Sequence, residues 1–283
     1  MSKLLTLSAA ALATGVFAVP AMAQETTPED NFNGPYVAGA ISLDQIKSGR
    51  GDGLAFDTNG DGNFDNNVLT STGANAFSPG FCNGGANGAT AAAGCMDDKN
   101  DIGYAGRIGF DKRLNGGSFV VGALIEGAGS QARDYSTGFS TTPASYTASR
   151  SLDYSAAARL RAGWSPGDGR GLFYATGGVA YGKIDHDFTT TNTANSFTEN
   201  NDGDWQFGWQ AGGGAELMVT RNISIGAEYL YSHYNDGDYS VGVTQGSAPA
   251  TNPFLLDSGQ TNLRPSDDNL SFHSFRATVG FHF

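Results

Sequence analysis

The chain has 283 residues, of which only 16% are charged, and it contains 41 glycines, 18 phenylalanines and 11 tyrosines. Enrichment in aromatic residues and glycine at low charge is typical of short strands and turns rather than of a helical enzyme. The formal net charge of −12 argues against nucleic acid as a partner, because an acidic surface repels phosphate.

The first residues have the form of an export signal. Lys3 precedes an apolar run over 4–19, and the small-x-small tripeptide Ala21-Met22-Ala23 follows it. We therefore predict a signal peptide over 1–23, cleaved after Ala23, and a short periplasmic segment over 24–34. A buried N-terminal helix is the alternative, but the apolar run is short and the residues after it are polar. Loss of the leader changes the net charge to −13 and leaves about 260 residues, enough for one all-β domain.

Eight segments of the remaining chain are predicted as strands. In six of them apolar residues alternate with polar ones, as in a strand whose two faces meet different surroundings. In the other two, 35–44 and 171–184, both faces are apolar or small, so their facing stays open. The predicted strands cover 35–44, 102–111, 119–127, 151–164, 171–184, 205–219, 223–231 and 275–283.

The connections between these strands alternate in length. Three are tight turns rich in Gly, Asn, Pro and Asp, and the others are long and polar, over 45–100, 131–150, 185–203 and 236–268. A sheet can cross a bilayer only if it closes on itself, because hydrocarbon offers no partner to a free edge. The pattern therefore predicts an eight-stranded antiparallel up-and-down transmembrane β-barrel over 35–283 with long extracellular loops.

Seven charged residues fall on the polar face of the predicted strands, which points into the barrel. An eight-stranded barrel is just wide enough for side chains to fill it, so we expect them to form a paired network. A proton or ion path, or paired carboxylates for acid–base chemistry, is the functional alternative. The seven are Arg107, Glu126, Arg159, Arg161, Glu216, Glu228 and Arg276.

The first long loop contains a candidate calcium site. Asp57, Asn59, Asp61 and Asp65 have the spacing of oxygen ligands around a turn glycine, and Asn63 offers its backbone carbonyl. The pattern lacks the bidentate glutamate at its twelfth position, so any Ca²⁺ affinity is expected to be weak. A bare loop is the alternative, because these residue types favour turns without an ion. No cofactor is otherwise required.

The two cysteines, Cys82 and Cys95, lie in the same loop. In an exported protein a nearby pair is expected to form a disulfide rather than a metal or redox site.

Several strand motifs resemble those of a known family. They are Tyr36-Val37-Ala38-Gly39, the run over 174–182, the run over 208–216, Ala227-Glu228-Tyr229-Leu230-Tyr231 and the closing Phe281-His282-Phe283. The chain resembles the small outer-membrane β-barrel proteins of Gram-negative bacteria, the porin-family or OmpA/OmpX-like group. The resemblance implies an integral protein of the cell outer membrane, surrounded by its lipid. It also implies that Phe283 is the terminal aromatic that the barrel-assembly machinery recognises.

The expected role is structural or surface-interacting, with an extracellular ligand that the sequence does not identify. A narrow porin-like channel or a small-ligand carrier is the main alternative. We predict no enzymatic activity, because the sequence has no nucleophile or metal-protease motif. A lipid-modifying barrel enzyme would need a serine beside a histidine on the lipid-facing surface, for which Ser271, His273 and Ser274 are the only crowded candidates.

Overall fold

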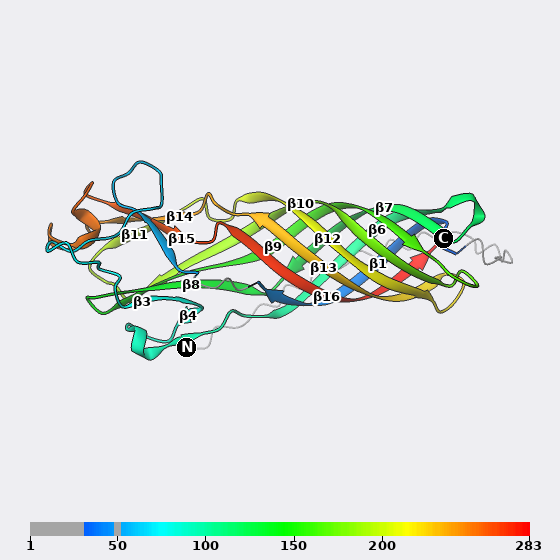
Figure 1. Cartoon of the computed structure of the whole chain (residues 1–283), viewed down its shortest axis with the longest axis horizontal. Helices are drawn as coiled ribbons and strands as arrows, with labels where there is room; N and C mark the ends of the chain where they lie inside the picture. The colour runs from blue at the N-terminus through cyan, green and yellow to red at the C-terminus, as the bar shows by residue number, and fades with distance from the viewer. Residues whose placement is uncertain (1–30, 48–51) are drawn as a thin grey trace, which may run out of the picture.

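Figure 1 shows the computed structural model, which describes residues 31–47 and 52–283. The predicted signal peptide and its cleavage site lie outside the described residues. Eight long antiparallel strands form a barrel, and neighbours in this order are hydrogen-bonded to each other. They are β1 (Gly34–Ile46), β6 (Asp101–Arg113), β7 (Phe119–Ser130), β9 (Ala144–Trp164), β10 (Gly171–Thr190), β12 (Trp205–Met218), β13 (Ile223–Asn235) and β16 (Asn269–His282).

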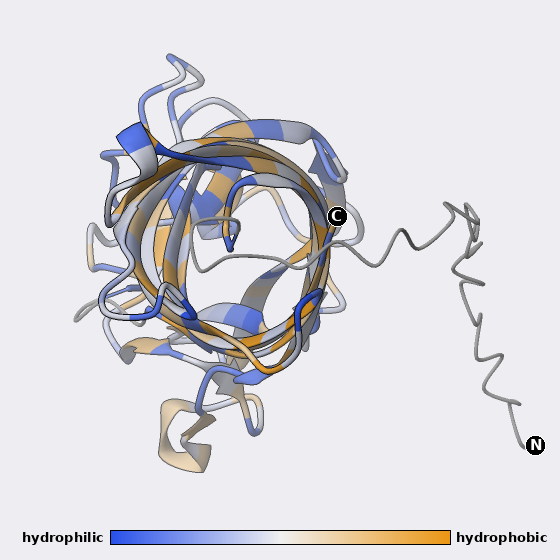
Figure 2. Cartoon of the chain, turned by 90° about the vertical axis from the view of Figure 1, so that its right-hand side faces the viewer, coloured by the Kyte–Doolittle hydropathy of each residue, from blue (hydrophilic) through white to orange (hydrophobic). Residues whose placement is uncertain are grey.

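The barrel closes between its first and last strands. Tyr36 of β1 lies opposite His282 of β16, and the antiparallel pairing runs to Ile46 opposite Phe272. Figure 2, seen along the barrel from the end with the short turns, shows the strands closed into a ring. The predicted eight-stranded antiparallel barrel is therefore confirmed. In the described ranges the only helical elements are 3-10 turns, η2 (Ala91–Ala93), η3 (Leu114–Gly116) and η4 (Pro253–Leu255), and none of them could cross a membrane as a helix.

Large apolar side chains cover the outer face of the barrel. Ile41, Leu160 and Phe207 are each at least 70% exposed, although an apolar side chain avoids water. Exposed apolar residues in a continuous band are the mark of a surface that faces lipid. The structure also decides the facing of the two strands that the sequence left open: Tyr36 on β1 and Tyr174 on β10 point inward.

One predicted facing is wrong. The alternation in 151–164 placed Leu152 on the outer face with Tyr154, but Leu152 is buried. The cause is a bulge: Lys183 pairs with Tyr154 and Ile184 pairs with Leu152, so Asp153 is skipped in the register. An extra residue in a strand reverses the facing of everything beyond it.

The long loops, predicted as polar connections, fold into an extracellular head. β2 (Leu54–Asp57), β11 (Ser196–Asn200), β14 (Ser240–Thr244) and β15 (Thr261–Pro265) form a second, four-stranded sheet. The predicted loop over 131–150 is β8 (Arg133–Ser140) and the first part of β9, and β8 also pairs with β3 (Gly80–Asn83). Figure 1 shows the head and the barrel end to end along the molecule. The alternation signal failed here because 144–152 is buried on both faces.

The head has its own apolar core, separate from the barrel. Its buried side chains come from the first and last long connections and from the outer end of β9, and the partly buried Phe188 and Phe197 of the third connection pack against them. Aromatic rings pack at its centre, where Phe56 and Phe77 have ring centroids 4.5 Å apart. The core consists of Leu54, Phe56, Val68, Ala76, Phe77, Ala144, Tyr146, Ala148, Tyr239, Val241, Val243, Phe254 and Leu263. The head is therefore a folded unit rather than a set of solvated loops.

Candidate functional site

Glycines make room for large side chains inside the narrow barrel. A Cβ at Gly109 would lie 2.5 Å from the ring of Tyr36, and one at Gly214 would lie 2.7 Å from the hydroxyl of Tyr174. Only glycine leaves space for such a close approach in a strand. The Tyr174 hydroxyl donates a hydrogen bond to Glu228 Oε2 at 2.8 Å. Part of the high glycine content is thus explained by the filling of the lumen.

The centre of the lumen is a cluster of three arginines and two glutamates from five strands. Arg159 and Arg276 bind opposite oxygens of Glu126 at 2.6 and 2.7 Å. Arg107 binds Glu228 at 2.8 Å. Arg159 and Arg276 also lie 3.6 and 3.5 Å from Glu228. Buried charges that are paired in this way cost far less than isolated ones. We call these five residues the central cluster.

A second cluster lies nearer the short turns. Arg161 binds Asp111 through two nitrogens and Glu216 Oε2 at 3.1 Å. Its guanidinium also lies 4.6 Å from the ring centre of Tyr36, a cation–π contact. Glu216 Oε1 accepts a hydrogen bond from Ser224 at 2.6 Å and contacts His282 Nε2 at 3.0 Å. The two clusters together hold four arginines and four carboxylates, so their charges balance.

Buried apolar side chains lie in the lumen on both sides of these clusters. Along β10 the inward side chains run from Leu172 and Tyr174 near the short turns, through Ala180 and Ile184, to His186, and Phe188 packs against the core of the head. At the short-turn end Phe32 is buried against Val120, Leu172 and Met218. Of the predicted periplasmic segment 24–34, the described part, 31–34, thus enters the barrel.

A third polar cluster joins the barrel to the head. Arg150 binds Asp134 at 2.8 Å and Asp236 at 3.1 Å. His186 Nε2 lies 3.1 Å from the same oxygen of Asp236, and its ring stacks on Tyr239 with centroids 4.0 Å apart. These contacts link β8, β9, β10 and the residue after β13. They hold the base of the head against the mouth of the barrel.

All seven residues predicted for the lumen point into it, but the prediction omitted several partners. Asp111 and His282 lie on the polar face of their predicted strands, so the alternation could have identified them. Tyr36 and Tyr174 could not, because their strands carry no polar alternation. The partner of each arginine depends on the barrel register, which a single sequence does not give.

The candidate calcium loop is held together by its own hydrogen bonds. The backbone N–H groups of Gly60 and Gly62 donate to the two carboxylate oxygens of Asp57 at 2.7 and 3.1 Å. Asn63 and Asn59 donate to Asp61, and these bonds lower the pKa of its exposed carboxyl. In the described ranges no group of three or more His, Cys, Asp or Glu side chains is arranged to hold a metal ion. Calcium binding stays a prediction. An ion in this loop would have to replace the hydrogen bonds that Asp57 accepts from Gly60 and Gly62.

Calorimetric titration of Ca²⁺ into the full chain tests that prediction. If the loop binds the ion, Asp61→Ala lowers the heat and weakens the affinity by at least about tenfold, which is about 1.4 kcal/mol. Asp238→Ala, an exposed carboxylate elsewhere in the head, is the matched control and leaves the titration unchanged. Equal heats for the unaltered chain and Asp61→Ala would remove calcium from this loop.

The two cysteines and the candidate nucleophiles have clear positions. Cys82 and Cys95 are joined in a disulfide that ties β3 to β5 (Cys95–Met96). His273 Nδ1 lies 2.7 Å from the hydroxyl of Tyr229 rather than beside a serine. Ser271 instead lies 2.8 Å from His233 Nδ1, and Ser274 is buried in the lumen. The predicted trio therefore does not form one group.

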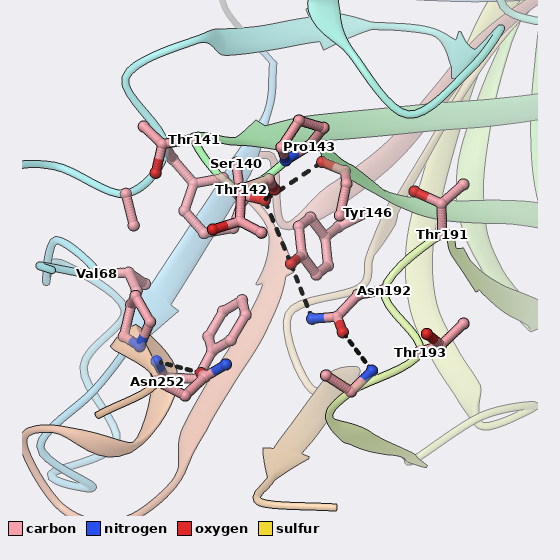
Figure 3. Close-up of a pocket in the computed structure, with 16 residues that line it drawn as sticks. Val68, Ser140, Thr141, Thr142, Pro143, Tyr146, Thr191, Asn192, Thr193 and Asn252 are labelled. Atoms are coloured by element: carbon pink, nitrogen blue, oxygen red, sulfur yellow. Dashed lines mark hydrogen bonds between the residues drawn. The ribbon is translucent and has the colours of Figure 1, made fainter. Parts of the chain in front are cut away.

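The head contains a cavity of about 250 Å³. Figure 3 shows it between the turn at 140–143, the segment at 191–194 and η4. Phe77, Tyr146 and Phe254 pack against one another at its base, with ring centroids 5.3 to 5.9 Å apart. Burial raises the pKa of Tyr146, so its phenol stays neutral. Sequence reasoning missed this cavity, because its walls come from distant loops.

The fold and the lumen define an outer-membrane β-barrel with a filled interior and a folded extracellular head. Residues 9–283 match the model of the outer membrane protein beta-barrel domain, and the chain belongs to that family. It is a protein of the outer membrane.

Two curated relatives match part of the chain. Over 135 residues it is 30% identical to the 31 kDa outer-membrane immunogenic protein of Brucella melitensis biotype 1 and to that of Brucella suis biovar 1. The match covers 46% of this chain and 53% of each relative. The chain thus spans about half the length of the curated relatives it matches.

Solved structures with a similar outline share little sequence. OprG of Pseudomonas aeruginosa is 11% identical with a TM-score of 0.48, over 90% of this chain and 99% of that one. Ail of Yersinia pestis, in complex with sucrose octasulfate, is 10% identical with a TM-score of 0.35, over 89% and 99%. The family assignment rests on the family model and not on these likenesses.

Proposed function

We propose that this protein acts at the cell surface through its extracellular head, with the barrel as a closed membrane anchor. The observation that carries the proposal is the pairing of charges in the lumen. In the two lumen clusters, every arginine binds a carboxylate at 3.1 Å or less. Buried apolar side chains lie above and below the clusters, and they support the interpretation of the lumen as filled. The polar interior is better explained as filling than as a pore.

Single-channel recording in planar bilayers tests this role. We expect the refolded full chain to give no reproducible conductance steps, because the clusters and the buried apolar side chains fill the lumen. A general porin in the same bilayer serves as the positive control. Reproducible steps from the chain, absent when it is heat-denatured before addition, would contradict the proposal and favour the narrow channel.

A second candidate is a small-ligand binder or carrier, and the cavity in the head is the observation that favours it. A concave site with an apolar base and a few polar groups is the usual form of a ligand site. This candidate is compatible with a closed barrel, since the cavity lies outside the lumen.

The surroundings of the barrel suggest two further partners. The apolar outer face supports the proposal that outer-membrane lipid surrounds the barrel. Phe283 is exposed and its ring lies 5.0 Å from that of Phe281, on the outer face at the short-turn end. We propose that it serves as the terminal aromatic for the barrel-assembly machinery. Phe283→Ala should lower the yield of assembled barrel in cells without changing refolding in detergent.

A further inference from the structure

The cavity in the head is built as a rigid, preformed site. Asn192 donates hydrogen bonds to the Tyr146 hydroxyl and to Asn195 Oδ1, both at 3.0 Å. Asn252 donates to the same Asn195 oxygen at 3.1 Å and accepts from the Phe254 N–H at 3.1 Å. Figure 3 shows Tyr146, Asn192 and Asn252 around the cavity, with the hydrogen bond between Asn192 and Tyr146 as a dashed line. A site whose walls are already ordered pays little entropy on binding.

The lining carries no charge. Among the described residues that form the cavity none is Asp, Glu, Lys or Arg, although the chain as a whole has a formal net charge of −12. A charged ligand would lose hydration here without gaining a counter-ion, which is costly. The occupant that fits is therefore neutral.

The base and the rim differ in chemistry. Phe77, Tyr146 and Phe254 give an aromatic and apolar base, whereas the rim carries threonine hydroxyls. Thr142 and Thr193 are exposed, and among the described residues no protein group is hydrogen-bonded to their hydroxyls. A hydroxyl both donates and accepts, so it pairs best with groups that do the same. The ligand thus needs an apolar face and hydroxyls at its edge.

The size limits the ligand further. The volume of about 250 Å³ is below the range of about 300–1,000 Å³ that is usual for drug-sized ligands. One small ring fits, and a large planar cofactor does not. A neutral hexose has C–H groups on its ring faces and hydroxyls at its edge, so it meets each requirement.

We propose that this cavity binds one neutral hexose residue of a glycan, with its ring toward the aromatic base and its hydroxyls toward Thr142 and Thr193. The proposal rests on the surface role given above and names its ligand class. Failure of the closed-barrel proposal and failure of the hexose site can be told apart, because conductance reports on the lumen and glycoside binding reports on the head.

Saturation-transfer NMR and calorimetry on the detergent-solubilised full chain test the site. The probes are the methyl glycosides of glucose, galactose and mannose, with methyl glucuronide as the charged analogue of the glucoside. We expect at least one neutral glycoside to bind, and the glucuronide to bind at least about tenfold more weakly than the best of them. No binding by any neutral glycoside, or equal binding of the glucuronide, would overturn the proposal.

Variants locate the binding in the cavity. Thr193→Trp fills the rim and should weaken binding by at least about tenfold, whereas Thr198→Trp makes the same change at an exposed position on β11 outside the cavity and should leave it unchanged. Thr142→Val removes one hydroxyl without adding bulk and should weaken binding by about threefold to tenfold. Binding that survives Thr193→Trp would place the glycoside elsewhere and refute the assignment.

Discussion

Truncation of Glu228 to alanine is expected to destabilise the barrel by about 3–5 kcal/mol, because it removes one partner from a buried charge cluster. Glu228 lies within 3.6 Å of Arg107, Arg159 and Arg276 and is itself buried. Without it the central cluster holds three arginines and the single carboxylate of Glu126. All three arginines are buried, so water solvates little of the charge that the truncation leaves unpaired.

The measurement is the urea midpoint of unfolding in lipid vesicles. The folded fraction at each urea concentration is read from the heat-modifiable band on a gel. Asp238→Ala is the matched control, since it removes an exposed carboxylate from the head and is expected to change stability by no more than about 0.5 kcal/mol. A cost below about 1 kcal/mol for Glu228→Ala would mean that water solvates the central cluster, and would weaken the argument for a closed lumen.

Replacement of Leu160 by arginine is expected to cost about 2–4 kcal/mol, the penalty for a cation on the lipid-facing side of a barrel near the bilayer midplane. Leu160 is 70% exposed on the outer face of β9 and lies opposite Ala123 of β7 and Gly177 of β10. Its exposure is favourable only if the surrounding medium is hydrocarbon.

Leu69 provides the control because it is an exposed leucine in the head, at 46%. Leu69→Arg makes the same chemical change where the surroundings are water, and is expected to shift stability by no more than about 0.5 kcal/mol. The urea midpoint in vesicles reports both variants. Equal costs at the two positions would contradict the assignment of the β9 outer face to lipid.

The membrane barrel was predictable because lipid and lumen impose opposite demands on successive residues. Ile108 and Phe110 alternate with Arg107 and Asp111, and no water-soluble helix would sort them in this way. The same rule gave the wrong facing at Leu152, because the bulge at Asp153 left no mark in the alternation. A bulge is decided by the register with neighbouring strands, and register depends on the whole closed sheet.

The fold of the head could not be predicted from the sequence, for a related reason. Strand residues over 144–152 are buried on both faces, so their polar and apolar members do not alternate. The glycine- and aspartate-rich connections had the composition of solvated loops, yet Val68 and Phe254 are buried in one core. Isolated apolar residues in a loop can be recognised as core residues only when the loops that pack against them are known.

The sequence by itself determined that the chain closes into an eight-stranded membrane barrel and that charged side chains fill it, because both follow from the local period of two. Only the tertiary structure decided which carboxylate neutralises each arginine, that the long loops share a core, and where that core leaves a cavity. Those features join residues that are far apart in the chain, and a local pattern carries no information on such pairs.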